Sequence, residues 1–259
     1  MSFNQKIVLV TGASKGIGAA ISVKFSIEKA SVILVSRNEN KLQEVAQKCK
    51  DFGGNPLVIA ADVTIDADVE RVIKKSIEHF GKLDVLINNA GFAASESILS
   101  KNALKVFDNI MAVNLRAHVL FTNLAATYLI ETKGCIINIS SIASTGICLR
   151  TNSQYSASKA GLDAFTRSIA IELSQYGVRA NSVNPGPVKS DFMESMGLNE
   201  DQQKQMWEML VKGTALNNII EPGEVADLVL FLASDKAKSI TGSSYVIDSG
   251  VLLKGIMDA

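Results

Sequence analysis

The sequence predicts an α/β protein of the Rossmann type: a doubly wound, mostly parallel sheet of about seven strands with helices on both faces. Three observations lead to this prediction. Short apolar runs alternate with segments of helical period along all 259 residues. The runs are apolar throughout, as expected of strands that are buried on both faces. The first run, Lys6–Val10, leads directly into a glycine-rich turn and a helix, the order in which doubly wound sheets begin.

The individual elements follow from these patterns. Expected strands are short and rich in Val, Ile and Leu, whereas expected helices carry an apolar residue every three or four positions. Strands are predicted at Lys6–Val10, Ser31–Val35, Pro56–Ala60, Leu83–Ile87, Cys135–Ile139, Val178–Val183 and Ser244–Ile247. Helices are predicted at about Gly16–Lys29, Glu39–Lys50, Ala103–Glu131, Gln154–Tyr176, Glu200–Val211 and Glu224–Ala233.

One further helix is marked at both ends. Thr64 or Asp66 is expected to cap its start, because short side-chain oxygens accept from the free N–H groups of a first turn. Gly81 is expected to follow its end, since glycine readily adopts the left-handed conformation found there. Its apolar face consists of Val69, Val72, Ile73, Ile77 and Phe80.

Composition bounds the function. Lys plus Arg and Asp plus Glu each number 26, and 47% of the residues are apolar. A neutral chain without a basic run is a poor candidate for binding nucleic acid or an anionic membrane. The first strand leaves no room for a signal peptide, and no apolar run approaches the ~18 residues of a membrane span. We therefore expect one cytoplasmic domain over residues 1–259, since no linker, repeat or low-complexity segment divides it.

Metal sites and disulfides are not expected. Cys49, Cys135 and Cys148 show no CxxC spacing, and their simplest interpretation is as small buried apolar residues in a reducing compartment. The two histidines, His79 and His118, lack a partner at the spacing of metal ligands.

The glycine-rich turn is the first candidate site. Thr11–Gly18 reads TGASKGIG, with glycines spaced G-x-x-x-G-x-G between a strand and a helix. Glycine lets a phosphate approach the backbone closely, and the helix start offers N–H groups to an anion. The turn therefore predicts a dinucleotide pyrophosphate site. Its candidate binding residues are Gly12, Ser14, Lys15, Gly16, Ile17 and Gly18.

The same turn also contains G-x-S-x-G, the pattern of a hydrolase nucleophile elbow. Three features disfavour a hydrolase. The turn follows the first strand, so no earlier strand–helix loop can supply an oxyanion hole. Both histidines lie within helical patterns, and no Asp-then-His pair occurs near the end of the chain.

The end of the second strand predicts NADPH or NADP⁺ as the cofactor. A site for NAD usually carries Asp or Glu here, which accepts from the ribose 2′-hydroxyl and would repel a 2′-phosphate. This chain has Ser36 followed by Arg37, with Lys15 in the glycine turn. Two cations can pair with a 2′-phosphate, the Arg in bidentate fashion.

Tyr155 and Lys159 form a candidate catalytic pair. Tyr155 alone among the four tyrosines has Lys four residues on, and these positions share one helix face. An ammonium ~4 Å from a phenolate stabilises it by roughly 4 kcal/mol at an effective dielectric of about 20, which lowers the pKa of the phenol by about 3 units. Such a phenol could donate a proton to a carbonyl oxygen near neutral pH.

Several motifs, in order, resemble the short-chain dehydrogenase/reductase family over nearly the whole chain. The likeness extends to 3-oxoacyl-carrier-protein reductases and to carbonyl and steroid reductases. Besides the glycine turn, the motifs are Asp62-Val63, Asn88 with Asn89–Gly91, Val113-Asn114, NISS at Asn138–Ser141, YSASK at Tyr155–Lys159, NPGPV at Asn184–Val188 and TGSSYVIDSG at Thr241–Gly250.

The resemblance implies a role for each matching position. Tyr155 would be the general acid/base, and Lys159 would lower its pKa and hold the nicotinamide ribose. Ser141 would bind the carbonyl oxygen, and Asn114 would help to hold a water of the proton relay. Further cofactor contacts are implied for Ser36, Arg37, Asp62, Val63, Asn89, Ala90, Gly91, Ile139, Pro185, Gly186, Val188 and Ser190.

Some positions depart from the family pattern. The loop from Ser141 to Tyr155 is about one residue longer than in many relatives, and Ser140 places a second hydroxyl beside Ser141. Ser190 stands where relatives often carry Thr, and Asp248-Ser249-Gly250 replaces the more usual Asp-Gly-Gly.

The substrate is expected to be lipophilic, because the residues that should surround the carbonyl are mostly apolar. A ketone, a steroid-like carbonyl such as that of an ecdysteroid, or a quinone fits this expectation. A 3-oxoacyl thioester remains an alternative, and by resemblance residues 190–212 would form a lid. The candidate substrate contacts are Ser141, Ala143, Cys148, Tyr155, Phe192, Met193 and Trp207.

Two function classes stay open. One is an NADPH-dependent enzyme that transfers a hydride to C=O groups or from CH–OH groups of a small molecule. The other is a sensor or scaffold that binds NADPH without turnover. The complete set of Asn114, Ser141, Tyr155 and Lys159 favours the enzyme. The resemblance also implies a homotetramer or homodimer.

Overall fold

The computed structural model describes residues 2–146, 151–189 and 199–254. Within these residues seven strands form one parallel sheet in the order β3-β2-β1-β4-β5-β6-β7. From the central strand β1, the chain adds β2 and β3 on one side and then crosses back to add β4 to β7 on the other side. This order confirms the predicted doubly wound α/β fold. The strands are β1 Ile7–Thr11, β2 Ser31–Ser36, β3 Asn55–Ala60, β4 Val85–Asn88, β5 Cys135–Ile139, β6 Arg179–Pro185 and β7 Ser244–Ile247.

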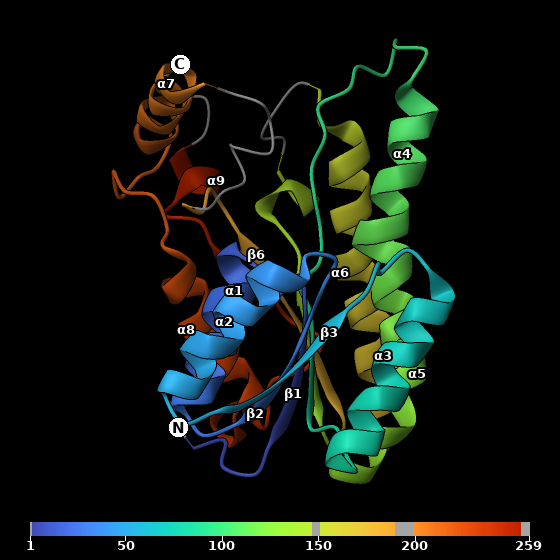
Figure 1. The fold of residues 1–259 in the computed structure, drawn as a ribbon. Helices are drawn as coiled ribbons and strands as arrows, with labels where there is room; N and C mark the ends of the chain where they lie inside the picture. Colours follow the sequence, from blue (N-terminus) through green and yellow to red (C-terminus); the bar gives the residue numbers. More distant parts are fainter. Residues whose placement is uncertain (1, 147–150, 190–198, 255–259) are drawn as a thin grey trace.

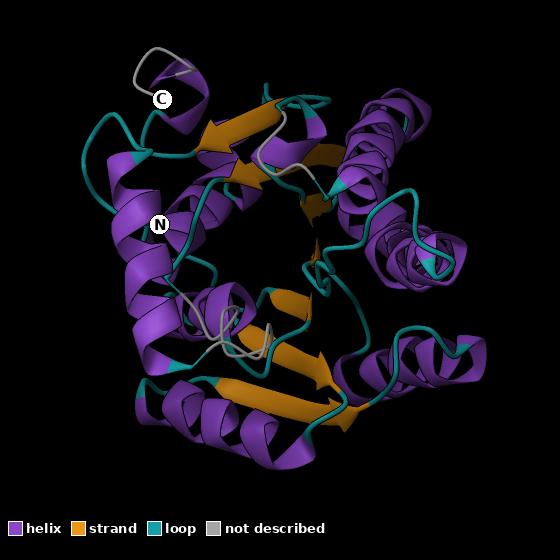
Figure 2. Ribbon diagram, turned by 90° about the horizontal axis from the view of Figure 1, so that it is seen from above, coloured by secondary structure: helices purple, strands orange, loops and turns teal. Residues whose placement is uncertain are grey.

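Helices cover both faces of this sheet (Figures 1 and 2). Helices α1, α2 and α8 lie on one side, and α3, α4, α5 and α6 lie on the other. Their bounds are α1 Gly16–Ile27, α2 Glu39–Asp51, α3 Asp66–Phe80, α4 Ala103–Met111, α5 Ala117–Thr132, α6 Ser153–Ser174, α7 Glu200–Lys212, α8 Pro222–Ala233 and α9 Val251–Lys254.

The central strands explain why the apolar runs have no alternation. All five residues of β1 and of β5 are buried, because helices pack on both of their faces. One face of the sheet buries Phe25 of α1 against Val8 and Val10, and the other buries Phe121 of α5 against Leu9 and its neighbours. Two apolar layers therefore hold the sheet in place, with its strand ends free to form a site.

Two sequence expectations were wrong in detail. The predicted caps of α3, Thr64 and Asp66, do not cap it: Ile65 is the N-cap residue, and Asp66 is already helical. The Thr64 backbone N–H and hydroxyl instead donate to Asp62, at 2.9 and 2.7 Å. The expected C-cap, Gly81, is confirmed, with φ at 76°.

The helix predicted at Ala103–Glu131 is also interrupted. Helices α4 and α5 are joined by a π-helical turn at Ala112–Arg116, which widens the helix by one residue. Apolar periodicity does not reveal such a turn, because the apolar residues on both sides keep a helical spacing.

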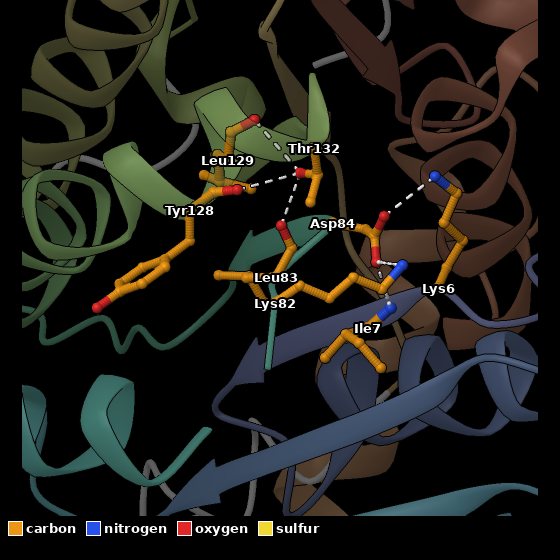
Figure 3. A network of polar contacts seen from close by, with 8 residues as sticks. All are labelled: Lys6, Ile7, Lys82, Leu83, Asp84, Tyr128, Leu129 and Thr132. Carbon is orange, nitrogen blue, oxygen red and sulfur yellow. Dashed lines mark hydrogen bonds and ion pairs between the residues drawn. The ribbon is translucent and has the colours of Figure 1, made fainter. Parts of the chain in front are cut away.

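Asp84 ties together the amino-terminal edge of the sheet, opposite the edge where the strands end (Figure 3). It is 3% exposed, and it accepts from the backbone N–H of Ile7 at 2.9 Å and from Lys6 Nζ at 3.0 Å. Lys82 Nζ lies 3.0 Å from the second carboxylate oxygen. Nearby, the Thr132 hydroxyl donates to the Leu83 carbonyl at 2.8 Å.

Replacing Asp84 with Ala is therefore expected to lower the free energy of unfolding by about 2–4 kcal/mol. The variant leaves a buried N–H group without its acceptor and two ammonium groups without their carboxylate. Urea unfolding followed by circular dichroism measures the loss. Asp227→Ala is the control: it removes the partner of Lys24 at the surface and should cost less than about 1 kcal/mol. Equal losses in both variants would contradict the anchoring role.

Candidate functional site

The glycine turn lies where β1 ends and α1 begins, at the switch point between β1 and β4. Gly12 and Gly16 have φ of 67° and 55°, in the left-handed region that glycine adopts without strain. A Cβ on Gly18 would lie 2.3 Å from the Gly12 carbonyl oxygen. Lys15, the N-cap of α1, provides no side-chain acceptor to the helix start. The turn thus exposes backbone, as a phosphate cradle requires.

The segment after β4 is fastened to this turn. The Thr11 hydroxyl accepts from the backbone N–H groups of Asn89 and Ala90, both at 3.0 Å. The Asn89 side-chain amide donates in return to the carbonyls of Thr11 at 2.9 Å and Gly12 at 3.2 Å. On the far side, His118 Nε2 lies 2.7 Å from the Ala90 carbonyl. The predicted cofactor residues Asn89 and Ala90 therefore form one rigid unit with the glycine turn.

The end of β2 lies beside the same turn, where the Ala13 N–H donates to the Val35 carbonyl at 3.1 Å. The Ser36 hydroxyl is buried without a hydrogen-bond partner among the described residues, and Arg37 beside it is exposed. Desolvation acts to raise the pKa of Asp62. The hydrogen bonds from Thr64 and the charge of Arg37 outweigh it, so the pKa is lowered. The predicted residues Ser36, Arg37 and Asp62 thus gather at one edge, with Val63 buried behind Asp62.

Tyr155 and Lys159 lie on one face of α6, as their spacing predicted. Lys159 is 3% exposed, and its Nζ donates to the Ile139 carbonyl at the end of β5 at 2.8 Å. The same nitrogen lies 5.8 Å from the centroid of the Tyr155 ring. Burial lowers the pKa of Lys159 to about 8, and the charge of Asp163 opposes this lowering. A positive charge is thus held beside a half-buried phenol.

The two neighbouring serines are distinguished by their contacts. Ser140 is buried, and its hydroxyl donates to the Lys159 carbonyl at 3.2 Å. Ser141 is half-buried and begins a 3-10 turn, Ile142–Ser144, where its oxygen accepts from the N–H of the buried Ala143 at 3.1 Å. Because the Ser141 oxygen accepts in this bond, its hydroxyl proton stays available for donation. These contacts favour Ser141 over Ser140 as the residue that faces a substrate.

Asn114 lies in the π-helical turn and is completely buried. Its side-chain oxygen accepts from the Phe92 N–H at 3.0 Å, and its side-chain nitrogen donates to the Phe92 carbonyl at 2.9 Å and to Ser158 Oγ at 3.2 Å. A Cβ on Gly91 would lie 3.3 Å from Asn114 Oδ1 and 3.4 Å from Lys159 Nζ. The structure therefore brings Gly91, Asn114 and Lys159 together.

The segment after β6 borders the site from the other side. The Gly186 N–H donates to the Ile247 carbonyl at 2.8 Å, and a Cβ on Gly186 would lie 2.8 Å from the Asp248 Cα. Val188 bridges to Ile220. Pro185, Gly186 and Val188 therefore lie at the carboxyl end of the sheet, and their contacts with a cofactor stay a prediction.

The described contacts do not place five of the predicted substrate and cofactor residues at this site. Trp207 lines a surface hollow of about 620 Å³ whose described lining residues all belong to α7. Tyr155 and Ser141 are not among these lining residues, and a contact of Trp207 with the substrate stays a prediction. Four other predicted residues lie outside the described part of the chain: Cys148, Ser190, Phe192 and Met193.

Three buried polar residues had been assigned no role: His118, Asp163 and Asn184. Burial and the charge of Lys159 lower the pKa of His118 to about 3, against its bond to Ala90, so the ring is neutral near pH 7. Asp163 lies four residues after Lys159 and eight after Tyr155, a spacing that could have placed it on their face. Its contact with Asn184 of β6 depends on the folded chain and gives no local signal.

The described residues contain no group of three or more His, Cys, Asp or Glu side chains arranged to hold a metal ion. Cys49 and Cys135 are buried free thiols, and Cys148 lies outside the described residues. None of the helices that the structure describes is long and apolar enough to cross a membrane.

Comparison with known proteins gives a consistent result. A family model described as enoyl-(acyl carrier protein) reductase matches residues 12–252. An uncharacterised oxidoreductase of Thermotoga maritima is 34% identical over 251 residues, which are 96% of this chain and 98% of that protein. Glucose 1-dehydrogenase 2 of Bacillus subtilis is 31% identical over 251 residues, 96% and 95% of the two chains. A solved structure from Caenorhabditis elegans, a short-chain dehydrogenase/reductase of unknown function with cofactor, has a TM-score of 0.91 at 31% identity and covers 97% of this chain and 96% of that one.

Proposed function

Because the chain belongs to the short-chain dehydrogenase/reductase family, we propose that it is an NADP(H)-dependent enzyme that interconverts a ketone and a secondary alcohol with Tyr155 as general acid/base. Membership of this family supports an oxidoreductase that uses a nicotinamide dinucleotide and acts on CH–OH or C=O groups. The observation that carries the finer proposal is the buried Lys159 ammonium, which lies 5.8 Å from the centroid of the Tyr155 ring and beside Gly91 at the end of β4.

The residues present fit a dinucleotide. Gly12 and Gly16 take positive φ in a partly exposed turn whose backbone can approach a pyrophosphate, and Gly18 lets that turn pack closely, because a Cβ there would lie 2.3 Å from the Gly12 carbonyl oxygen. Asp62 and Val63 would border the adenine. The buried, unpartnered Ser36 hydroxyl supports a polar ligand at the adenosine end, and the neighbouring cation Arg37 supports a 2′-phosphate over a free hydroxyl.

The bound cofactor supplies the hydride for reduction and accepts it in the reverse direction. Tyr155 donates its hydroxyl proton to the carbonyl oxygen, and Ser141 donates a hydrogen bond to the same oxygen as negative charge develops on it. Lys159, whose pKa is about 8, stays mostly protonated near pH 7 and favours the phenolate that remains. His118, whose pKa is about 3, holds Ala90 as a neutral ring and takes no part in proton transfer.

The favoured substrates are lipophilic ketones and steroid-like carbonyls. A 3-oxoacyl thioester is the second candidate, because the motifs resemble those of 3-oxoacyl-carrier-protein reductases and the matching family model is also named for an acyl-carrier-protein reductase. The test is the decay of NADPH absorbance over a panel of lipophilic ketones, steroid ketones, quinones and a 3-oxoacyl thioester. Turnover of a ketone supports the proposal. Tight binding of NADPH without turnover of any carbonyl would favour a sensor or scaffold and overturn it.

The choice of cofactor depends on Arg37. Arg37→Asp is expected to reduce the ratio of kcat/KM for NADPH to kcat/KM for NADH by about 100-fold, because a 2′-phosphate loses a charged partner and meets a carboxylate. Initial rates with each cofactor measure the ratio. Lys50→Asp, at the far end of the adjacent helix α2, is the control and should leave the ratio unchanged. Equal kcat/KM with both cofactors in the wild type would refute the preference.

A further inference from the structure

A buried carboxylate links the two halves of the candidate site. Asp163 is 4% exposed on α6, one helical turn beyond Lys159. Its Oδ2 accepts from Asn184 Nδ2 of β6 at 2.7 Å. The same Asn184 nitrogen lies 2.9 Å from Ser144 Oγ and 3.2 Å from the Ser141 carbonyl oxygen. Through Asn184, the carboxylate therefore connects the helix that carries Tyr155 to the turn that carries Ser141.

Asn184 is itself held by a hydrogen bond within β6. Its side-chain oxygen accepts from the Ser182 hydroxyl at 3.1 Å, with Ser182 Oγ also 2.8 Å from Ser244 Oγ of β7. Its amide nitrogen carries two protons and has three acceptors within reach. Because the Asp163 carboxylate is the strongest of these acceptors, it determines how the amide is oriented toward the Ser141 turn.

The hydrogen bond to Asn184 does not require a charged side chain at position 163. An Asn side chain at the same position would offer Asn184 an equivalent oxygen without burying a charge. The second oxygen, Oδ1, is buried and has no hydrogen-bond partner among the residues that the structure describes. Burying a charge with an unsatisfied oxygen is destabilising unless another group compensates for it. The group of opposite charge is Lys159, which is also buried and lies one helical turn earlier on α6, and the charge of Asp163 raises the pKa of Lys159 against the lowering by burial.

We propose that Asp163 is a positioning residue of the site: its buried carboxylate keeps the positive charge on Lys159 and, through Asn184, fixes the turn that presents Ser141. The inference rests on the proposed function, in which Lys159 acts on Tyr155 and Ser141 binds the carbonyl oxygen. Among the described residues, the titratable groups that act on Lys159 are Tyr155 and Asp163 from α6 and His118 from α5. His118 stays neutral above about pH 4. Its charge therefore does not change near pH 8, where Lys159 titrates.

The first test needs no turnover. The wild type and Asp163→Asn are labelled with ¹³C-lysine, and the Lys159 signal, assigned by its loss in Lys159→Met, is followed against pH. The wild-type midpoint is expected near 8. Asp163→Asn keeps the shape and the bond to Asn184, and it should lower the midpoint by about 1 pH unit or more. An unchanged midpoint overturns the proposal, even in a chain without measurable activity.

The second test separates the effect of Asn184 on the Ser141 turn from the effect of Asp163 on the charge of Lys159. Asn184→Ala should leave the Lys159 midpoint and the Kd for NADPH unchanged while it reduces kcat for ketone reduction about tenfold, since the Ser141 turn loses a hydrogen bond. A wild-type kcat would overturn the link to Ser141. Asp227→Asn on the surface of α8 is the matched control and should change neither readout.

If Asp163→Asn does not accumulate as folded protein, the titration of Lys159 is measured in Asp163→Ser instead. Absence of turnover in the wild type with a lowered midpoint in Asp163→Asn would refute the proposed reaction and support the charge link.

Discussion

Tyr155→Phe is expected to reduce kcat/KM for ketone reduction by about 1,000-fold or more, while the Kd for NADPH stays within about threefold of the wild type. The substitution removes one hydroxyl group and keeps the ring against which Lys159 lies. Without that hydroxyl no proton donor remains at the carbonyl oxygen, and Ser141 can only donate a hydrogen bond. The glycine turn, the Asn89 bonds and the Lys159–Ile139 bond are untouched, so cofactor binding is retained.

Steady-state rates with a ketone from the panel give kcat/KM, and the fluorescence of bound NADPH gives its Kd. Tyr176→Phe is the control, because this tyrosine is 47% exposed beyond the end of α6. A Tyr155→Phe enzyme that retains more than a tenth of the wild-type rate would show that another group supplies the proton.

Gly18→Val is expected to abolish measurable binding of NADPH and to lower the free energy of unfolding by about 3 kcal/mol. A Cβ at this position would lie 2.3 Å from the Gly12 carbonyl oxygen and 2.5 Å from Asn89 Nδ2. Neither atom can withdraw easily: Gly12 belongs to the tight turn, and the Asn89 amide is bonded to two carbonyls. The turn must therefore open, which would remove the backbone groups proposed to bind the pyrophosphate.

Urea unfolding and NADPH titration measure the two effects. Gly223→Ala is the matched control for adding a Cβ near a helix start, because the nearest atom would be Lys24 Cε at 4.0 Å. That variant should unfold and bind NADPH like the wild type. Wild-type affinity for NADPH in Gly18→Val would place the cofactor elsewhere and contradict the assignment of this turn.

The elements of the fold could be predicted where local pattern determines them. Buried parallel strands such as β1 and β5 appear in the sequence as uninterrupted apolar runs. Strand β5 has the predicted bounds, and β1 begins and ends one residue later than predicted. The cap of α3 was wrong because Thr64 has a competing local partner, Asp62. The π-helical turn was not foreseen because the bonds that fasten it, from Asn114 to Phe92, join residues 22 positions apart.

The same distinction applies to the candidate site. The shared face of Tyr155 and Lys159 follows from a helical spacing of four, so the amino-acid sequence is enough to predict the pair. The contact of Asp163 with Asn184 spans 21 residues and two elements, so only the folded chain reveals it. The motif positions at the ends of β1, β4, β5 and β6 do meet at one edge of the sheet, as parallel strands require. Their chemical roles remain predictions.

The most direct test of the proposed function follows the hydride itself. NADPH carrying deuterium at the transferable position of its nicotinamide ring is incubated with a ketone from the panel, and the product alcohol is analysed by mass spectrometry. The wild type should place one deuterium on the carbinol carbon, and Tyr155→Phe should yield no detectable deuterated alcohol under the same conditions. A wild-type protein that binds the labelled cofactor and transfers deuterium to no carbonyl would contradict the proposed function.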